Sequence, residues 1–351
     1  MNGEIAKWIE DFVVPKYDAF DKGHQREHAR YVIDTALSLS EHYDVDRDMV
    51  AVAAACHDLG LAVDRKTHHL ESGRMIRGMQ ELRQWFSEAQ IETIAQAAED
   101  HRASSKDEPR SIYGKIIAEA DRQIIPDVVI RRTVQFGLKN YPELDREGHW
   151  DRTVAHLEEK YADGGYLRLW IPESDNAARL EELRATIRDR KKLREEFEAL
   201  YKEERYKEMI PGISSLLAGE DDVIAKMANL SAVLHRTFGF WWTGFYIVRG
   251  DVLVLGPFQG PLACMRIPFG KGVCGTAWKR EETVVVPDVE QFPGHIACSS
   301  ESRSEIVVPL WQNGRVTAVL DIDSASLATF DGTDQRYLEE ILRTCFSQAA
   351  N

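Results

Sequence analysis

The chain has 351 residues, 44% of them hydrophobic and 29% charged, which is enough for two or three domains that each bury a core. Its formal net charge of -14 at pH 7 argues against binding to nucleic acid or to an anionic membrane. No stretch approaches the roughly 18 apolar residues of a membrane-spanning helix. Residues 1–18 carry acids among their apolar positions and lack the basic start of a signal peptide, so we expect a cytoplasmic protein.

Residues 1–173 form the first predicted domain, which we expect to be all-helical. Apolar residues recur at helical spacing in EHARYVIDTALSLSEHY, RDMVAVAAACHDLG and SEAQIETIAQAAEDH. No convincing alternating strand pattern interrupts these runs. Gly60 lies just past one of them, where we expect a helix to end in a left-handed turn.

Histidine and aspartate recur along these predicted helices, at His28, in the adjacent pair His57-Asp58 and at Asp121. Helices from distant parts of a sequence can bring such side chains to a common centre. Imidazole nitrogen and carboxylate oxygen, without thiolate, suit a divalent cation, and the residues do not distinguish Mn, Fe, Co, Ni and Mg. Such a cation can lower the pKa of a bound water and polarise a phosphoryl oxygen.

In the order H…HD…D, these residues resemble the HD superfamily of metal-dependent phosphohydrolases over about residues 15–125. The resemblance implies that the four residues just named bind the metal, and that His69 and His101 bind a second metal or contact phosphate. The lysine of the cyclic-dinucleotide branch is missing, because Leu61 follows Gly60. An acidic chain without a basic groove favours a small phosphorylated substrate over a polynucleotide. An inactive HD domain is the alternative.

Residues 174–206 are dense in Glu, Arg, Lys and Leu, and they predict one long exposed helix that links two domains. An apolar stripe runs from Leu180 to Leu200 but breaks at Arg190 and Arg194. The stripe can belong to a solvated linker. It can also form a coiled-coil seam between two copies, which would make the protein a homodimer.

Residues 207–351 form the second predicted domain, an α+β domain with an antiparallel sheet. The segment DDVIAKMANLSAVLHRTF predicts an amphipathic helix, and five β-rich runs follow it: WWTGFYIV, VLVLGPF, ETVVVPDV, SEIVVPLW and VTAVLDID. Asn313-Gly314 between the last two runs predicts a tight hairpin. A closing helix, DGTDQRYLEEILRTCF, begins at Asp331 or Thr333 as the cap.

Three of the five cysteines, Cys264, Cys274 and Cys298, lie in this domain without a CxxC pair. Clustered thiols in a reducing compartment are more often reactive than structural. A thiolate can attack a sulfoxide sulfur and become a sulfenic acid, which a second cysteine converts to a disulfide for an external dithiol to reduce. Cys56 and Cys345 are expected to be small buried residues without such a role.

Acidic and aromatic residues around these cysteines predict a pocket for a free amino acid. Glu305 starts an apolar strand, and Asp321 and Asp323 lie two residues apart in the next strand, so they point to one face of the sheet. Two carboxylates on one face suit an ammonium group. Trp242 and Tyr246 suit the apolar side chain of a thioether-like ligand, and a purely structural Trp242 in the core is the alternative.

The segments GPFQGPLACMRIPFGKGVCGTA, VEQFPGHIACSSESRSEIVVPL and LDIDS resemble the signatures of free-methionine-(R)-sulfoxide reductases, which are GAF domains. The resemblance covers about residues 206–346. It implies that Cys298 attacks free L-methionine-(R)-sulfoxide, that Cys264 resolves the sulfenic acid as a disulfide, and that thioredoxin or a similar dithiol reduces that disulfide. Cys274 matches the third family cysteine, and Met265 stands where a β-branched residue is expected.

The same resemblance implies that the three carboxylates bind the substrate, that the two aromatic residues wall its pocket, and that the GAF domain binds no cofactor. Two hypotheses then cover the whole chain. In the first, a bifunctional enzyme joins an HD phosphohydrolase-like domain to a working reductase. In the second, the GAF domain senses an amino acid or the redox state and regulates the HD domain. A scaffold with two inactive sites is a third class.

Overall fold

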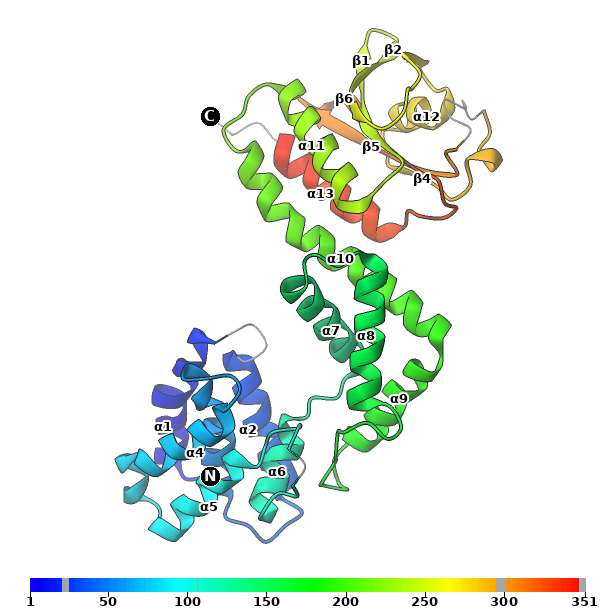
Figure 1. The fold of residues 1–351 in the computed structure, drawn as a ribbon. Coiled ribbons are helices and arrows are strands. Elements are labelled where there is room, and N and C mark those ends of the chain that lie inside the picture. Colours follow the sequence, from blue (N-terminus) through cyan, green and yellow to red (C-terminus); the bar gives the residue numbers. More distant parts are fainter. Residues whose placement is uncertain (21–24, 106, 295–300, 347–351) are drawn as a thin grey trace. The chain divides into compact units, whose positions relative to one another are not determined.

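The computed structural model describes residues 1–20, 25–105, 107–294 and 301–346 (Figure 1). The chain folds as two compact units, residues 1–197 and residues 198–351. Within the described part of the chain, no helix is both long enough and apolar enough to cross a membrane.

The first unit is helical, and its described residues contain no β-strand, which confirms the all-α prediction. One apolar core, which includes Val50, Ala54 and Ile94, is shared by helices of this unit. Its short helices are η1 (Ile9–Val13), η2 (Val14–Ala19), η3 (Leu59–Ala62) and η4 (Gln80–Gln84). Its α-helices are α1 (Gly3–Trp8), α2 (Arg26–Ser40), α3 (Arg47–Cys56), α4 (His68–Gly78), α5 (Glu88–Glu99), α6 (Ile112–Asp121), α7 (Pro126–Asn140), α8 (Arg146–Tyr161), α9 (Asn176–Arg188) and the start of α10 (Arg190–Leu217).

Gly60 is needed for close packing and not for a left-handed helix end, so that local prediction is wrong. α3 ends at Cys56, and the φ angle of Gly60 is not positive. A Cβ at Gly60 would lie 2.0 Å from the carbonyl oxygen of His68 and 2.7 Å from the backbone nitrogen of Ser72. The backbone of η3 therefore packs directly against that of α4, and only glycine allows this approach.

The segment predicted as one exposed linking helix is two helices, and the first unit buries most of its apolar stripe. α9 ends at Arg188, and Asp189 separates it from α10. α9 packs against α7 and α8. Five residues of the stripe are each at most 4% exposed: Leu180, Leu183, Ile187, Leu193 and Phe197. A stripe that the chain buries by itself is neither a solvated linker nor a seam between copies, and the homodimer remains a prediction.

The second unit is built on a six-stranded antiparallel sheet with the strand order β3-β2-β1-β6-β5-β4. Five of the strands are the five predicted runs, and β3 is too short to show a period of two. The strands are β1 (Trp242–Arg249), β2 (Val252–Gln259), β3 (Arg266–Pro268), β4 (Val284–Val286), β5 (Ser304–Gln312) and β6 (Arg315–Ser324).

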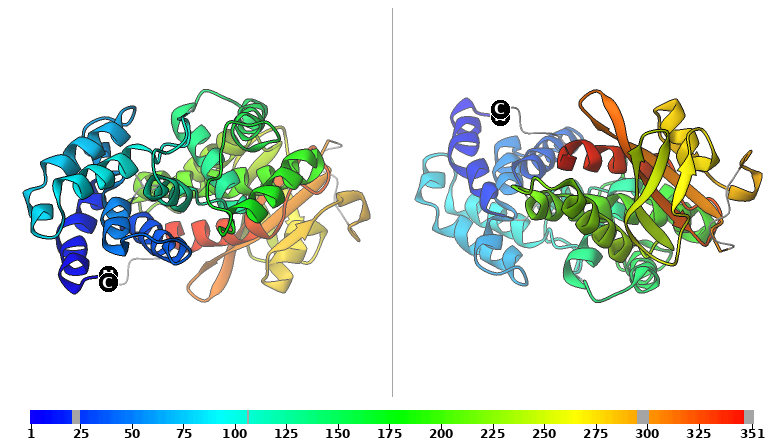
Figure 2. Two further views of the ribbon diagram at one scale, coloured as in Figure 1. Left: turned by 90° about the horizontal axis from the view of Figure 1, so that it is seen from below. Right: turned by 90° about the horizontal axis from the view of Figure 1, so that it is seen from above.

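Helices cover both faces of this sheet, as Figures 1 and 2 show. The helices of the unit are the rest of α10, α11 (Val223–Phe238), α12 (Gly272–Arg280), α13 (Gly332–Phe346) and the short η5 (Val289–Gln291). α10, α11 and α13 pack on one face through a cluster that includes Phe245 and Leu320. α12 packs on the other face, where a second cluster includes Trp242 and Tyr246. Because side chains alternate along a strand, β1, β4, β5 and β6 each contribute to both clusters.

The local signals of the second unit are confirmed. Asn313 and Gly314 join β5 to β6 with positive φ angles of 52° and 73°, as a type I′ hairpin requires. Asp331 caps α13, because its Oδ1 accepts a hydrogen bond from the backbone nitrogen of Thr333 at 2.7 Å. The order helix, antiparallel sheet, helix is the predicted α+β domain.

Candidate functional site

Three helices of the first unit bring histidine and aspartate to one buried cluster. His28 lies in α2, the pair His57-Asp58 follows α3, and Asp121 ends α6. The Nε2 of His57 is 3.2 Å from Asp58 Oδ2 and 3.6 Å from Asp121 Oδ1. The Nε2 of His28 is 3.7 Å and 3.3 Å from the same two atoms. The structure therefore gathers all four residues predicted as metal ligands.

A second group of donors shares Asp58 with the first. His68, the first residue of α4, and His101, just after α5, each place Nε2 3.4 Å from Asp58 Oδ1. The two Nε2 atoms lie 3.1 Å apart. Asp58 thus presents Oδ2 to the first group and Oδ1 to the second. His101, which the sequence predicted to bind a second metal or contact phosphate, belongs to this second group.

His69 does not join this second group, although the sequence pointed to it. Its ring centre is 5.6 Å from that of His68, and its Nδ1 is buried without a hydrogen-bond partner. Burial, followed by the nearby charge of Arg102, lowers the pKa of His69 to about 4, so its imidazole is neutral at pH 7. The structure places the neighbouring residue, His68, beside Asp58 instead.

Three of the four histidines, His57, His68 and His101, are oriented as metal ligands. An imidazole that donates its Nδ1 proton to a carbonyl keeps the Nε2 lone pair for a metal. The Nε2 of His57 is buried and has no partner of hydrogen-bond geometry. The Nδ1 atoms lie at hydrogen-bond distance from the carbonyl three residues earlier, at 2.7 Å for His57 and Ala54, 2.8 Å for His68 and Arg65, and 2.5 Å for His101 and Ala98. This donor set fits one or two divalent cations.

The charges of the cluster also favour a cation. Burial alone would raise the pKa of Asp58, but the neighbouring imidazoles, His57 first, hold it well below its usual range. His28 and His57 likewise outweigh burial and lower the pKa of Asp121. Both carboxyl groups are therefore ionised at neutral pH, which is the form that binds metal.

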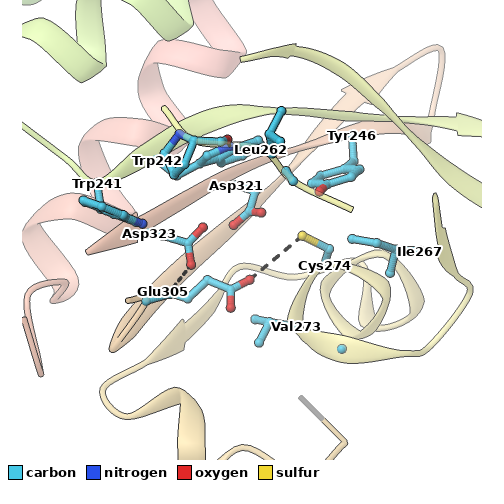
Figure 3. Close-up of a pocket in the computed structure, with 14 residues that line it drawn as sticks. Trp241, Trp242, Tyr246, Leu262, Ile267, Val273, Cys274, Glu305, Asp321 and Asp323 are labelled. Carbon is cyan, nitrogen blue, oxygen red and sulfur yellow. Dashed lines mark hydrogen bonds between the residues drawn. The ribbon is translucent and has the colours of Figure 1, made fainter. Parts of the chain in front are cut away.

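The second unit has a pocket of about 50 Å³ on the sheet face that α12 covers (Figure 3). That volume has room for about four water-sized groups, which suits a small ligand. Asp323 on β6 pairs with Trp242 on β1 and with Glu305 on β5. Asp321 and Tyr246 line the same pocket. The structure therefore brings together all five residues predicted to bind the substrate.

Three carboxyl groups and one thiol lie together in this pocket, those of Glu305, Asp321 and Cys274 buried and that of Asp323 half-buried. The Sγ of Cys274 lies 3.9 Å from Glu305 Oε1. The Oδ1 of Asp321 is buried and has no hydrogen-bond partner. Asp323 accepts a hydrogen bond from the hydroxyl of Ser302, a pocket residue that the sequence analysis missed. Because buried charges need partners of opposite sign, so many acid groups in one pocket favour a positively charged ligand group.

Burial sets the protonation of these groups. Burial and repulsion by Asp321 and Asp323 raise the pKa of Glu305 well above its usual range, and burial with repulsion by Asp323 does the same for Asp321. Burial raises the pKa of Asp323 to about 6, against the hydrogen bond from Ser302. Burial, with Asp321 and Glu305 nearby, also raises the pKa of Cys274, which keeps it a thiol.

The predicted reactive cysteines have different surroundings. Cys274 is free and buried in α12. Cys264 is disulfide-bonded, and its carbonyl oxygen accepts a hydrogen bond from the Tyr246 hydroxyl at 3.0 Å. Cys298 lies outside the described residues. Cys56 and Cys345, predicted to be small buried residues, are both buried free thiols.

Trp242 is both a core residue and a pocket wall. It is 4% exposed, stacks with Tyr246 at 5.9 Å and Phe258 at 5.4 Å between ring centres, and donates its Nε1 proton to the carbonyl of Pro261 at 3.2 Å. The same ring lines the pocket. Its position is therefore fixed by packing before any ligand binds.

Gly244 leaves the space that the Trp242 ring occupies. A Cβ at Gly244 would lie 2.6 Å from Trp242 Cη2 and 2.4 Å from Phe258 Cβ. We expect Gly244→Ala to displace the ring and to lower the free energy of unfolding by about 1–3 kcal/mol. Urea unfolding measures this loss. Gly332→Ala is the matched control, because a Cβ there meets nothing within 4 Å. An unchanged unfolding midpoint for Gly244→Ala would contradict the packing described.

Two family models match the chain, an HD domain over residues 26–123 and a GAF domain over residues 224–345. GAF domain-containing protein A of Dictyostelium discoideum is 56% identical over 143 residues, which are 40% of this chain and 90% of that protein. The free methionine-R-sulfoxide reductase of Escherichia coli is 45% identical over 40% of this chain and 86% of its own length. That of Saccharomyces cerevisiae is 40% identical over 41% and 85%.

Proposed function

Because the chain belongs, through its GAF domain, to the family of the free methionine-R-sulfoxide reductases and also carries an HD domain, we propose that its second unit reduces free L-methionine-(R)-sulfoxide with cysteine thiols. The observation that carries the proposal is a pocket in which three carboxyl groups lie beside Trp242 and Tyr246, with the disulfide-bonded Cys264 next to Tyr246. A pocket that only senses a ligand does not need a cysteine that forms a disulfide.

The proposed reaction has three steps. The Cys298 thiol takes the oxygen of the sulfoxide, so methionine leaves and the cysteine becomes a sulfenic acid. Cys264 then condenses with that sulfenic acid to a disulfide and releases water. Thioredoxin or a similar cytoplasmic dithiol reduces the disulfide and is itself oxidised. The disulfide-bonded Cys264 and the thiol kept at Cys274 support this division of roles.

The carboxyl groups divide between acid and ligand-binding roles. Burial raises the pKa values of Glu305 and Asp321, which favours their protonated forms, and a protonated carboxyl can donate a proton to the sulfoxide oxygen. Asp323, with a pKa of about 6, is ionised at neutral pH and can pair with an ammonium group. Trp242 and Tyr246 would enclose the apolar side chain.

The direct test follows thioredoxin-dependent oxidation of NADPH with three substrates side by side. These are free L-methionine-(R)-sulfoxide, its (S)-epimer and a peptide-bound sulfoxide. We expect turnover with the free (R)-epimer alone. No turnover with any of the three would contradict the proposal and assign the GAF domain a sensory role over the HD domain.

The pH dependence of KM follows from Asp323. We expect the KM for the free amino acid to rise below about pH 6, by up to roughly tenfold per pH unit, because a protonated carboxyl cannot pair with ammonium. Burial also raises the pKa values of Glu305 and Asp321, so the Asp323→Asn variant is needed to identify the group responsible. Steady-state kinetics between about pH 5 and about pH 8 test this. A flat wild-type profile, or an inflection retained in Asp323→Asn, would contradict it.

The same raised pKa predicts the opposite trend for stability. The folded state binds the Asp323 proton more tightly than the unfolded state does, so Asp323 contributes an increase in the free energy of unfolding as the pH falls from about 6 to about 4, whereas His69, with its pKa lowered to about 4, contributes a decrease. The free energy of unfolding of wild type relative to Asp323→Asn should therefore rise while ligand affinity falls, which separates loss of binding from acid unfolding.

For the first unit we propose metal-dependent hydrolysis of a small phosphorylated compound. The HD match and the two donor groups support it. His28, His57, Asp58 and Asp121 would hold one divalent cation, and Asp58, His68 and His101 a second. Such cations supply a bound water of lowered pKa and polarise a phosphoryl oxygen. The backbone carbonyls of Ala54, Arg65 and Ala98 orient three of the histidine rings. A screen of phosphoesters with each metal tests the proposal.

A further inference from the structure

Trp241 carries a buried donor that the protein itself does not use. Four residues of the described pocket wall have an indole, phenol or hydroxyl donor. Trp242 donates to Pro261, Tyr246 donates to Cys264 and Ser302 donates to Asp323. The Nε1 of Trp241 is buried and has no partner. A buried N–H without an acceptor is unfavourable, so an acceptor on a ligand is expected here.

This donor faces an acceptor at one end of the pocket. In Figure 3 the indole nitrogen of Trp241 turns toward Asp323, which lines the same pocket and is half-buried. Tyr246, which contacts the carbonyl of Cys264, lies at the other end. No lysine, arginine or histidine lines the described part of the pocket. A negatively charged ligand group therefore has to be bound by neutral donors.

We propose that Trp241 and Asp323 together recognise the two charged groups of a free amino acid, with the Trp241 N–H donating to its α-carboxylate and Asp323 accepting from its α-ammonium. A free amino acid carries both groups on one carbon, so it needs a donor and an acceptor side by side. The inference rests on the proposed function and deepens it, because it makes Trp241 a specificity-determining residue for the same substrate.

The same arrangement orients the ligand. With its charged groups at Trp241 and Asp323, the side chain runs along the stacked rings of Trp242 and Tyr246 toward the end where Cys264 lies. A peptide-bound sulfoxide has neither charge, so it lacks the strong charge-assisted hydrogen bonds at this end. The pair thus gives a physical reason for selecting the free amino acid.

Calorimetric titration of the full chain with L-methionine and with L-methioninol, which lacks the carboxylate, tests the assignment. Trp241→Phe keeps a ring but removes the N–H. We expect it to weaken L-methionine binding by at least roughly tenfold and to change L-methioninol binding less than about twofold. Wild type should prefer L-methionine over L-methioninol by a similar factor. Trp311→Phe, at a side chain 46% exposed, is the matched control and should change neither affinity.

The outcomes separate this inference from the proposed function. Unchanged L-methionine affinity in Trp241→Phe, equal losses for both ligands, or no binding of either ligand to wild type would each overturn the inference. Turnover of wild type is measured in parallel. If wild type reduces the sulfoxide while Trp241→Phe binds normally, only the inference fails. If wild type shows the expected binding pattern without turnover, the inference stands and the reductase proposal fails.

Discussion

Cys298→Ser is expected to abolish reduction of free methionine-(R)-sulfoxide, with a loss of at least about a thousandfold in kcat/KM. A hydroxyl is a far weaker nucleophile than a thiolate toward sulfur, and Cys274 cannot take over, because burial raises its pKa and keeps it a thiol. The measurement is thioredoxin-coupled turnover under saturating reductant.

The remaining cysteines supply the controls for this result. Cys264→Ser should still release about one methionine per chain in a single turnover and then stop, because only resolution is lost. Cys345→Ala, at a buried free thiol of α13, should keep the activity. Full activity of Cys298→Ser together with inactivity of Cys274→Ser would show that the nucleophile is wrongly assigned.

Asp58→Asn should remove metal from both donor groups of the HD domain, because Asp58 offers one oxygen to each. We expect wild type dialysed against Mn²⁺ or Co²⁺ to retain about two ions per chain and Asp58→Asn to retain less than one, with any phosphoesterase activity reduced at least about a hundredfold. Elemental analysis gives the stoichiometry. Asp34→Asn, at an exposed aspartate of α2, is the matched control and should retain both ions.

Variants of His68 and His69 test the ligands of the second donor group separately. His68→Ala should lower the metal content by about one ion per chain, because its Nε2 lies beside Asp58 and His101. His69→Ala should leave it unchanged. If His69→Ala loses the ion and His68→Ala does not, the second donor group has been assigned to the wrong neighbour.

The fold was predictable wherever a periodic pattern was long enough. Helical spacing located α2, α3, α5 and α11, and five alternating or apolar runs located all strands except β3. The site carboxylates were predictable for the same reason. Asp321 and Asp323 share a face by alternation. The pairing of Asp323 with Glu305 depends on the Asn313-Gly314 hairpin and also on a register shift between Leu310 and Trp311, which no sequence pattern predicted.

The features that could not be predicted from the sequence depend on packing between distant segments. His68 and His69 are adjacent, so their spacing from other residues does not show which of them lies beside Asp58. That choice depends on how α4 packs against Gly60, which is a tertiary contact. The charge-rich stretch after Ser174 suggested exposure, but the packing of α9 against α7 and α8 buries Leu183. Trp241 precedes β1, where strand alternation gives no direction for its side chain.

The cross-strand pairing of Asp323 with Trp242 and Glu305 links ligand binding to the alignment of the sheet. A slip of β6 by one residue would turn both of its pocket aspartates into the opposite cluster, beside Phe245 and Ile306. Carboxylates buried there without partners would destabilise the slipped sheet strongly. The acids of the pocket therefore also specify the strand register, because the slipped sheet is less stable than the native one.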